Sequence, residues 1–229
     1  MKKGIIFFIS ALLVSTLTAT MAGAWGLPSI PGRSALPIST SASADPDAFL
    51  AKAKKAEVLV DKSSDLLFKS VATKEEMAKM EEMQKKLNET TDDKEKNAIR
   101  QQIRESETAT IEKRSKDKEL LAEASKMDEK RKKQIGDAFY NLSLGSLQTS
   151  ALVPEGTSIA NSIQNNPVNA ARLALKAKSV YESVKTLGSL GTNITKVLSA
   201  IKPLMSSAKI EAKAPSSAAD KPRDIEGGI

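Results

Sequence analysis

Apolar residues recur in alternating steps of four and three along most of this chain, and that spacing is compatible with few folds. A 4-3 repeat places its members on one face of an α-helix. After residue 24, no stretch alternates apolar and polar residues as a half-buried strand would. The chain is therefore predicted to be all-α. The first repeat comprises Phe49, Ala53, Ala56, Val60, Ser63, Leu67 and Ser70.

Capping residues predict where the helices begin. Asp45-Pro46-Asp47 combines a cap, a first-turn proline and an acid that complements the helix dipole. Thr73-Lys74-Glu75-Glu76 matches a capping box, so the first helix is expected to kink or restart there. Turn-forming residues at 88–93, followed by a cap at Asp92 or Asp93, predict a reversal. The returning seam is predicted to be Ile99, Ile103, Ser106, Thr110, Lys113, Asp117, Leu120, Ala124 and Met127.

Residues 45–144 are thus expected to form a long antiparallel, coiled-coil-like helical hairpin. At about 1.5 Å of rise per residue it would be roughly 65–75 Å long. Its base would pair 48–71 with 119–135, and its polar tip, 74–118, would protrude as a thin charged arm. Such a tip has little to bury and is expected to be the least stable part.

A second, shorter hairpin is predicted at residues 167–209. Gly145, Pro154 and Gly156 indicate a connector at 145–166, with one short helix near 157–164. Asn166-Pro167 predicts the next helix start, Gly188 and Gly191 a tight turn, and Pro203 a kink or an end. The short hairpin would pack against the base of the long one as a four-helix bundle. Residues 210–229 are predicted to be a disordered tail.

The N-terminus has the pattern of an export signal. Lys2 and Lys3 precede an apolar stretch, and Ala22-Gly23-Ala24 matches a signal-peptidase site. Residues 1–24 are therefore predicted to be a signal peptide, followed by a disordered Pro/Ser-rich linker at 25–44. The mature protein would be periplasmic or secreted. The alternative is that the apolar stretch remains as an N-terminal membrane anchor.

The composition provides few of the residue types that catalysis and metal binding usually require. The chain has no cysteine and no histidine, which removes thiol nucleophiles, disulfides and the commonest metal ligand. Two Ser-x-x-Lys patterns, at Ser115 and Ser199, lack the partner motifs of a serine acyl-enzyme. We therefore expect a non-enzymatic protein with no catalytic residue, no cofactor and no metal site.

Positive charge is concentrated in two places. The formal net charge is +7, while residues 74–118 carry twelve basic and twelve acidic residues and are neutral. Residues 167–209 carry seven basic residues against Glu182, and a second cluster lies near 126–133, expected opposite Lys52, Lys54 and Lys55. The candidate surface for an anionic partner is Arg172, Lys176, Lys178, Lys185, Lys196, Lys202, Lys130, Arg131, Lys132 and Lys133. The other interpretation is that these lysines only keep the protein soluble.

Two function classes remain open. The exported, basic architecture with a helical arm resembles, in shape, envelope chaperones with coiled-coil tentacles. The favoured class is a binding, scaffold or chaperone-like protein of the cell envelope, with a protein partner or an anionic membrane surface. The alternative is a secreted, pore-forming-like protein, against which the charged tip argues. Nucleic acid is disfavoured by the export signal and the scarcity of aromatic residues. The sequence leaves the oligomeric state open.

Overall fold

The computed structural model describes residues 45–164, 167–211 and 213–225, with no side-chain description for 164–174. Several predictions lie outside these residues. They are the signal peptide at 1–24, the linker at 25–44, the helix cap at Asn166 and the side chain of Arg172.

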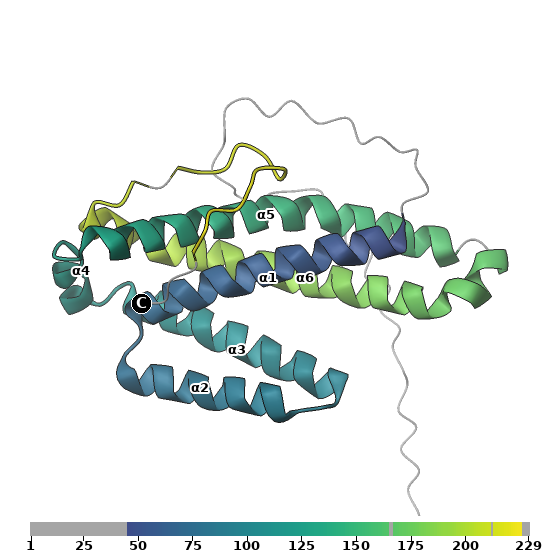
Figure 1. Ribbon diagram of the computed structural model, residues 1–229, viewed down its shortest axis with the longest axis horizontal. Helices are drawn as coiled ribbons and strands as arrows, with labels where there is room; N and C mark the ends of the chain where they lie inside the picture. The colour runs from purple at the N-terminus through teal and green to yellow at the C-terminus, as the bar shows by residue number, and fades with distance from the viewer. Residues whose placement is uncertain (1–44, 165–166, 212, 226–229) are drawn as a thin grey trace, which may run out of the picture. The chain divides into compact units, whose positions relative to one another are not determined.

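The described chain is all-α and contains six helices, which confirms the predicted fold class (Figure 1). No strand occurs among the described residues. The helices are α1 (Pro46–Val71), α2 (Lys74–Glu89), α3 (Asp93–Arg114), α4 (Lys118–Ala124), α5 (Glu129–Gln164) and α6 (Pro167–Ala208).

The predicted caps begin the first three helices. The carboxylate of Asp45 accepts a hydrogen bond from the Asp47 amide, and that of Asp92 accepts one from the Glu95 amide. At Thr73 both halves of the capping box are present. The Glu76 amide donates to the Thr73 hydroxyl at 3.2 Å, and the Thr73 amide donates to the Glu76 carboxylate at 2.9 Å. These bonds satisfy amides that have no partner within the helix.

Helices α1, α5 and α6 form the body of the fold. Arg131, near the start of α5, donates to the carbonyl of Ser70 at the end of α1, and Lys52 pairs with Glu155 at 3.0 Å. The two helices therefore run antiparallel. Helix α6 follows α5 after a short connection and returns along it (Figure 1). The predicted antiparallel pairing of α1 with the returning chain is thus present. The predicted hairpin at 167–209 is not, because Pro167–Ala208 form the single helix α6, which pairs with α5 instead.

The long protruding arm is not observed. The reversal near 90–92 is confirmed, but the chain also reverses at Ala72-Thr73, so α2 turns back instead of extending α1. Arg104 on α3 bonds to Asp61, and Arg114 donates to the carbonyl of Val71, so α3 runs parallel to α1. The capping box ends one helix and starts another, and α3 then covers the apolar residues of α1 and α6.

Helices α5 and α6 continue through the predicted breaks. Gly145 and Gly156 of α5 face α1, where an added Cβ would lie 2.5 Å from Val60 Cγ2 at residue 145. These glycines therefore permit close helix packing and do not form a connector. Pro154 and Pro203 lie exposed, where water can satisfy the carbonyls that lose a partner. Across Gly188 and Gly191, Leu187, Leu190 and Ile194 keep one buried face, so packing outweighs the local turn signal.

The seam predicted for α1 is confirmed, because all seven of its residues are buried. In the returning seam the prediction is correct at Ile99 and Ile103 and wrong at Ser106, Thr110 and Lys113; farther on, Ala124 is buried as predicted, and Leu120 and Met127 pack against the core. On α3, Glu107 and Ile111 are buried, whereas Lys113 is exposed. The spacing of four from Ile103 to Glu107 to Ile111 keeps α3 against α1 and α6.

The segment that follows α6, predicted to be a disordered tail, packs on α5 over residues 213–225. Asn141 hydrogen-bonds to the backbone of Arg223, and Gln148 donates to the carbonyl of Ala218. Ile225 packs against the apolar core. The polar composition of this segment is matched by polar side chains on α5, which is why composition did not indicate its order.

Candidate functional site

Three lysines form a row along the outer face of α6. Lys178, Lys185 and Lys196 are exposed, and the steps of seven and eleven residues place them within about 20° of one another around the helix axis. From residue 175 to the end of α6, Glu182 is the one acid among five lysines. Lys178 approaches Glu182 at 3.9 Å, a long and exposed pair that neutralises little.

Two exposed apolar side chains lie beside this row. Leu175 is 84% exposed and Tyr181 is 64% exposed, the two largest values among the exposed large hydrophobic residues. Each lies about 60° around the helix from Lys178, on opposite sides of it. We call Leu175, Lys178, Tyr181, Lys185 and Lys196 the outer α6 surface.

The other residues predicted on α6 do not join the row. Lys176 bonds to Asp47 at the start of α1. Lys202 is exposed, but lies about 120° around the helix from Lys196. The helical backbone includes Arg172, whose side chain is outside the described residues.

The predicted lysine cluster at 126–133 is largely engaged in local pairs. Lys132 pairs with Glu129 at 2.8 Å, and Lys133 with Asp137 at 2.6 Å. Arg131 donates to the Ser70 carbonyl, while Lys130 is exposed. Lys52 lies beside Glu155, so the predicted meeting of this cluster with Lys52–Lys55 is wrong. The α2–α3 fold-back changes the register of α1 against the returning chain.

A charged cluster that the sequence analysis missed lies between α1 and α3. The Arg104 guanidinium donates to Glu57 at 2.6 Å and to Asp61 at 2.7 and 2.9 Å. Burial would raise the pKa of Glu57, but the hydrogen bonds from Arg104 and Lys54 outweigh it and lower that pKa. The cluster holds α3 against α1.

Glu107 is the buried acid of this cluster, with 3% of its surface exposed. Burial raises the pKa of its carboxyl well above the usual value, and the nearby charges of Asp65 and Asp61 raise it further. Oδ1 of Asp65 is itself buried without a hydrogen-bond partner. Charged residues surround Glu107 in the sequence, so its position there gives no sign of burial.

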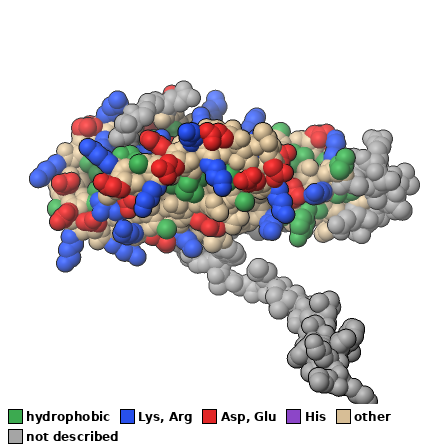
Figure 2. All heavy atoms as spheres, turned by 90° about the horizontal axis from the view of Figure 1, so that it is seen from below, with side chains coloured by type: hydrophobic (Ala, Val, Ile, Leu, Met, Phe, Trp, Pro, Cys, Tyr) green, Lys and Arg blue, Asp and Glu red, His purple; other side chains and the backbone are tan. Residues whose placement is uncertain are grey.

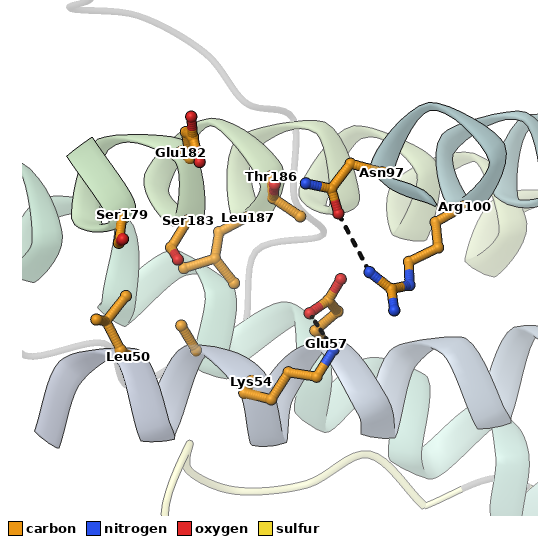
Figure 3. Close-up of a pocket in the computed structure, with 11 residues that line it drawn as sticks. Leu50, Lys54, Glu57, Asn97, Arg100, Ser179, Glu182, Ser183, Thr186 and Leu187 are labelled. Carbon is orange, nitrogen blue, oxygen red and sulfur yellow. Dashed lines mark hydrogen bonds and ion pairs between the residues drawn. The ribbon is translucent and has the colours of Figure 1, made fainter. Parts of the chain in front are cut away.

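A groove of about 290 Å³ lies between α1, α3 and α6 (Figure 3). One wall carries hydroxyls of α6, at Ser179, Ser183 and Thr186. Two polar contacts line it, each within one helix: Arg100 to Asn97 at 3.2 Å on α3, and Lys54 to Glu57 at 2.9 Å on α1. Acids and bases are mixed in the lining, so the groove has no single preferred ligand charge.

The face that includes α2 and α3 carries basic and acidic side chains interspersed (Figure 2). This pattern agrees with the equal counts of acids and bases at 74–118. The charge asymmetry in the described residues therefore belongs to α6 and not to the α2–α3 region.

The described residues offer little support for other kinds of site. No group of three or more acidic side chains is placed to hold a metal ion. No described helix is long and apolar enough to cross a membrane. Of the two serines in Ser-x-x-Lys patterns, Ser115 is fully buried and Ser199 is exposed. Among the described residues, neither serine hydroxyl forms a hydrogen bond with a lysine or arginine side chain.

Comparison with known proteins found no matching family model, no matching curated protein and no matching solved structure.

Proposed function

We propose that this chain is a non-enzymatic, exported helical binding protein of the cell envelope. In this proposal the outer α6 surface contacts an anionic membrane surface from outside the bilayer. The observation that carries the proposal is the row of Lys178, Lys185 and Lys196, which faces solvent with Glu182 as the nearby acid.

The spacing of the row suits a flat anionic surface. At about 1.5 Å per residue, the three ammonium groups extend over roughly 27 Å along α6. Each lysine near an anionic bilayer contributes on the order of 1 kcal/mol, and salt weakens that attraction. Three lysines acting together would give measurable binding at low ionic strength.

The exposed apolar residues favour a lipid surface over an acidic protein. Tyrosine is enriched at membrane interfaces, where its ring contacts lipid and its hydroxyl stays hydrated. Tyr181 and Leu175 flank the lysine row at exposures that leave them free for such contact. The outer α6 surface thus combines charge with a small apolar contribution.

The test is sedimentation with vesicles of neutral or anionic phospholipid at low and high salt. Wild-type protein is expected to sediment with anionic vesicles at low salt and to be released at high salt. A triple Lys178→Gln, Lys185→Gln, Lys196→Gln variant should lose this binding. The matched control replaces exposed Lys79, Lys94 and Lys118 with Gln, which removes the same charge from the α2–α4 region and should keep the binding.

Equal loss in both triple variants would show that net charge, and not the row, is responsible. Wild-type indifference to vesicle charge would overturn the proposal.

A further inference from the structure

Side chains on the outer face of α5 form hydrogen bonds with residues 213–225. Asn141, which is fully buried, donates to the carbonyl of Arg223 and accepts from its amide, both at 2.8 Å. A single side-chain amide thereby pairs with both polar groups of one backbone residue. This is recognition of an extended peptide backbone, independent of its side chain.

The Arg223 side chain is recognised separately. Its guanidinium donates to Asp137 at 3.0 Å and lies 4.0 Å from the centroid of the Tyr140 ring. A carboxylate at the edge and an aromatic face below suit a planar guanidinium better than an ammonium group. Asp137, Tyr140 and Asn141 lie within one turn of α5, so they form a rigid, preformed set that we call the arginine site.

Outside the arginine site, Ile225 packs against the apolar core, the Tyr140 hydroxyl donates to Asp220 at 3.4 Å, and the segment supports its own turn. Gln148 donates to the carbonyl of Ala218 at 3.2 Å. Asp220 accepts from the hydroxyls of Ser217 and Ser216, and these bonds lower the pKa of its carboxyl to about 2. In the described residues, no backbone-to-backbone hydrogen bond joins 213–225 to a helix.

The arginine site is lined by polar side chains, as is typical of an interface that can open reversibly. Asp137 is 6% exposed and Asn141 is fully buried, yet the partners of Asn141 and one partner of Asp137 belong to the tail. Polar groups in a permanent core are costly unless they are always paired. Here, removal of the tail would let water replace its hydrogen bonds, so the uncovered face remains compatible with solvent.

We propose that Asp137, Tyr140 and Asn141 form a receptor site for an extended, arginine-bearing peptide segment of a partner protein. Residues 213–225 of this chain occupy the site in the free protein and must leave before the partner binds. The proposal does not depend on the outer α6 surface, which lies on another helix. The preferred ligand has an arginine whose own backbone amide and carbonyl are free.

The test measures binding of a labelled peptide, KAPSSAADKPRDI (residues 213–225), to the full chain by fluorescence anisotropy. In the wild type the attached tail competes at an effective concentration of order millimolar, so the free peptide should bind weakly. In an Arg223→Ala protein the attached tail is a poor competitor, and the peptide should bind at least tenfold more tightly. A Lys221→Ala protein, changed at an exposed residue two positions away, is the matched control and should behave as the wild type.

The peptide is then varied while the Arg223→Ala protein is kept the same, so that α5 is unchanged. Replacing the peptide's arginine with alanine should weaken binding at least tenfold, and replacing it with lysine should weaken it less. Circular dichroism first establishes that the protein is folded. A folded Arg223→Ala protein that does not bind the peptide, or binds the alanine peptide equally well, overturns the proposal. A wild-type dimer that the peptide dissociates would make the tail of a second copy the occupant, and would overturn the assignment to a foreign partner.

Discussion

The body of the fold and the α2–α3 hairpin are stabilised in different ways. In the body, large apolar residues such as Phe49, Leu67 and Ile201 are fully buried, and two glycines bring α1 close to α5. In the hairpin, α2 buries Met80 and no other residue, and α3 meets α1 through the Arg104 cluster as well as through its isoleucines.

The difference predicts an order of opening. Burial of apolar surface is the main favourable term in folding, whereas partly exposed ion pairs contribute little. Separating the α2–α3 hairpin from the body therefore costs less free energy than unfolding the body. The amides of the hairpin should exchange with solvent before those of α5 and α6.

The largest effect is expected in the body, from Gly156→Ala. An added Cβ would lie 2.5 Å from Val184 Cγ2 and would also overlap the ring of Phe49, which is fully buried and cannot move aside. We expect a loss of about 2–3 kcal/mol in the free energy of unfolding, after the gain from replacing a helical glycine. Urea denaturation followed by circular dichroism measures it. Unchanged stability would mean that α1 and α5 are less closely packed than described.

Arg104→Met should act on the hairpin and not on the body. It leaves Glu57 and Asp61 without their shared cation, close to Asp65 and Glu107. We expect α3 docking to weaken by about 2 kcal/mol, less than for a fully buried pair because Asp61 is partly exposed. Hydrogen exchange by mass spectrometry should show faster exchange in α2 and α3, with α5 and α6 unchanged. Arg100→Met, which removes an arginine on α3 that bonds only to Asn97 of the same helix among the described contacts, is the matched control; equal acceleration by both variants would contradict the role of the cluster.

Glu107→Gln should remove a pH dependence of the same interface. The pKa of Glu107 is raised in the folded protein, so the folded state binds this proton more tightly than the unfolded state does. The resulting stabilisation is fully present below the ordinary pKa of 4.5 and is lost as pH rises through the pKa of the folded protein. Above pH 4.5, the wild type should therefore lose stability as pH increases. The neutral variant should lack this slope and be about 1–2 kcal/mol more stable at neutral pH. Urea titrations between pH 5 and 8 test this, and parallel curves for the two proteins would refute it.

The smallest effect is a gain. Gly188 has no atom within 4 Å of an added Cβ and lies exposed inside α6. Gly188→Ala should therefore raise the free energy of unfolding by about 0.5–1 kcal/mol, because alanine has the higher helix propensity. It is also the matched control for Gly156→Ala, since the substitution is the same but the surroundings differ. A destabilised Gly188→Ala protein would indicate that α6 bends or breaks there.

The sequence was sufficient to predict features that depend on neighbouring residues. The α1 seam and the caps at Asp45, Thr73 and Asp92 were correct, because helix periodicity and capping are local. The direction of the chain after Thr73 was not predictable in this way, because a capping box fits both a kink and a reversal. The glycines of α5 were misjudged because their role depends on Phe49 and Val60, far away in the sequence.

The candidate sites were predictable to a smaller extent. The lysines of α6 stood out by composition, but the alignment of Lys178, Lys185 and Lys196 needed a continuous helix across Gly188. No feature of the sequence analysis pointed to Asn141, and Arg223 lies in a segment predicted to be disordered. Their pairing depends on a contact across 82 residues, which no local pattern reveals.

The end of α1 is a junction for three helices, and this has a consequence for the folding pathway. Arg114, at the end of α3, and Arg131, near the start of α5, each donate to a backbone carbonyl in the last two residues of α1. Residues 72–128 therefore form a long loop whose two ends both lie at the end of α1. Helices α5 and α6 can pair across a short connection, whereas α1 must close that long loop to join them, at an entropic cost that grows with the logarithm of its length. We expect the α5–α6 pair to nucleate folding and α1 to dock later, so that substitutions on α1 change the unfolding rate more than the folding rate.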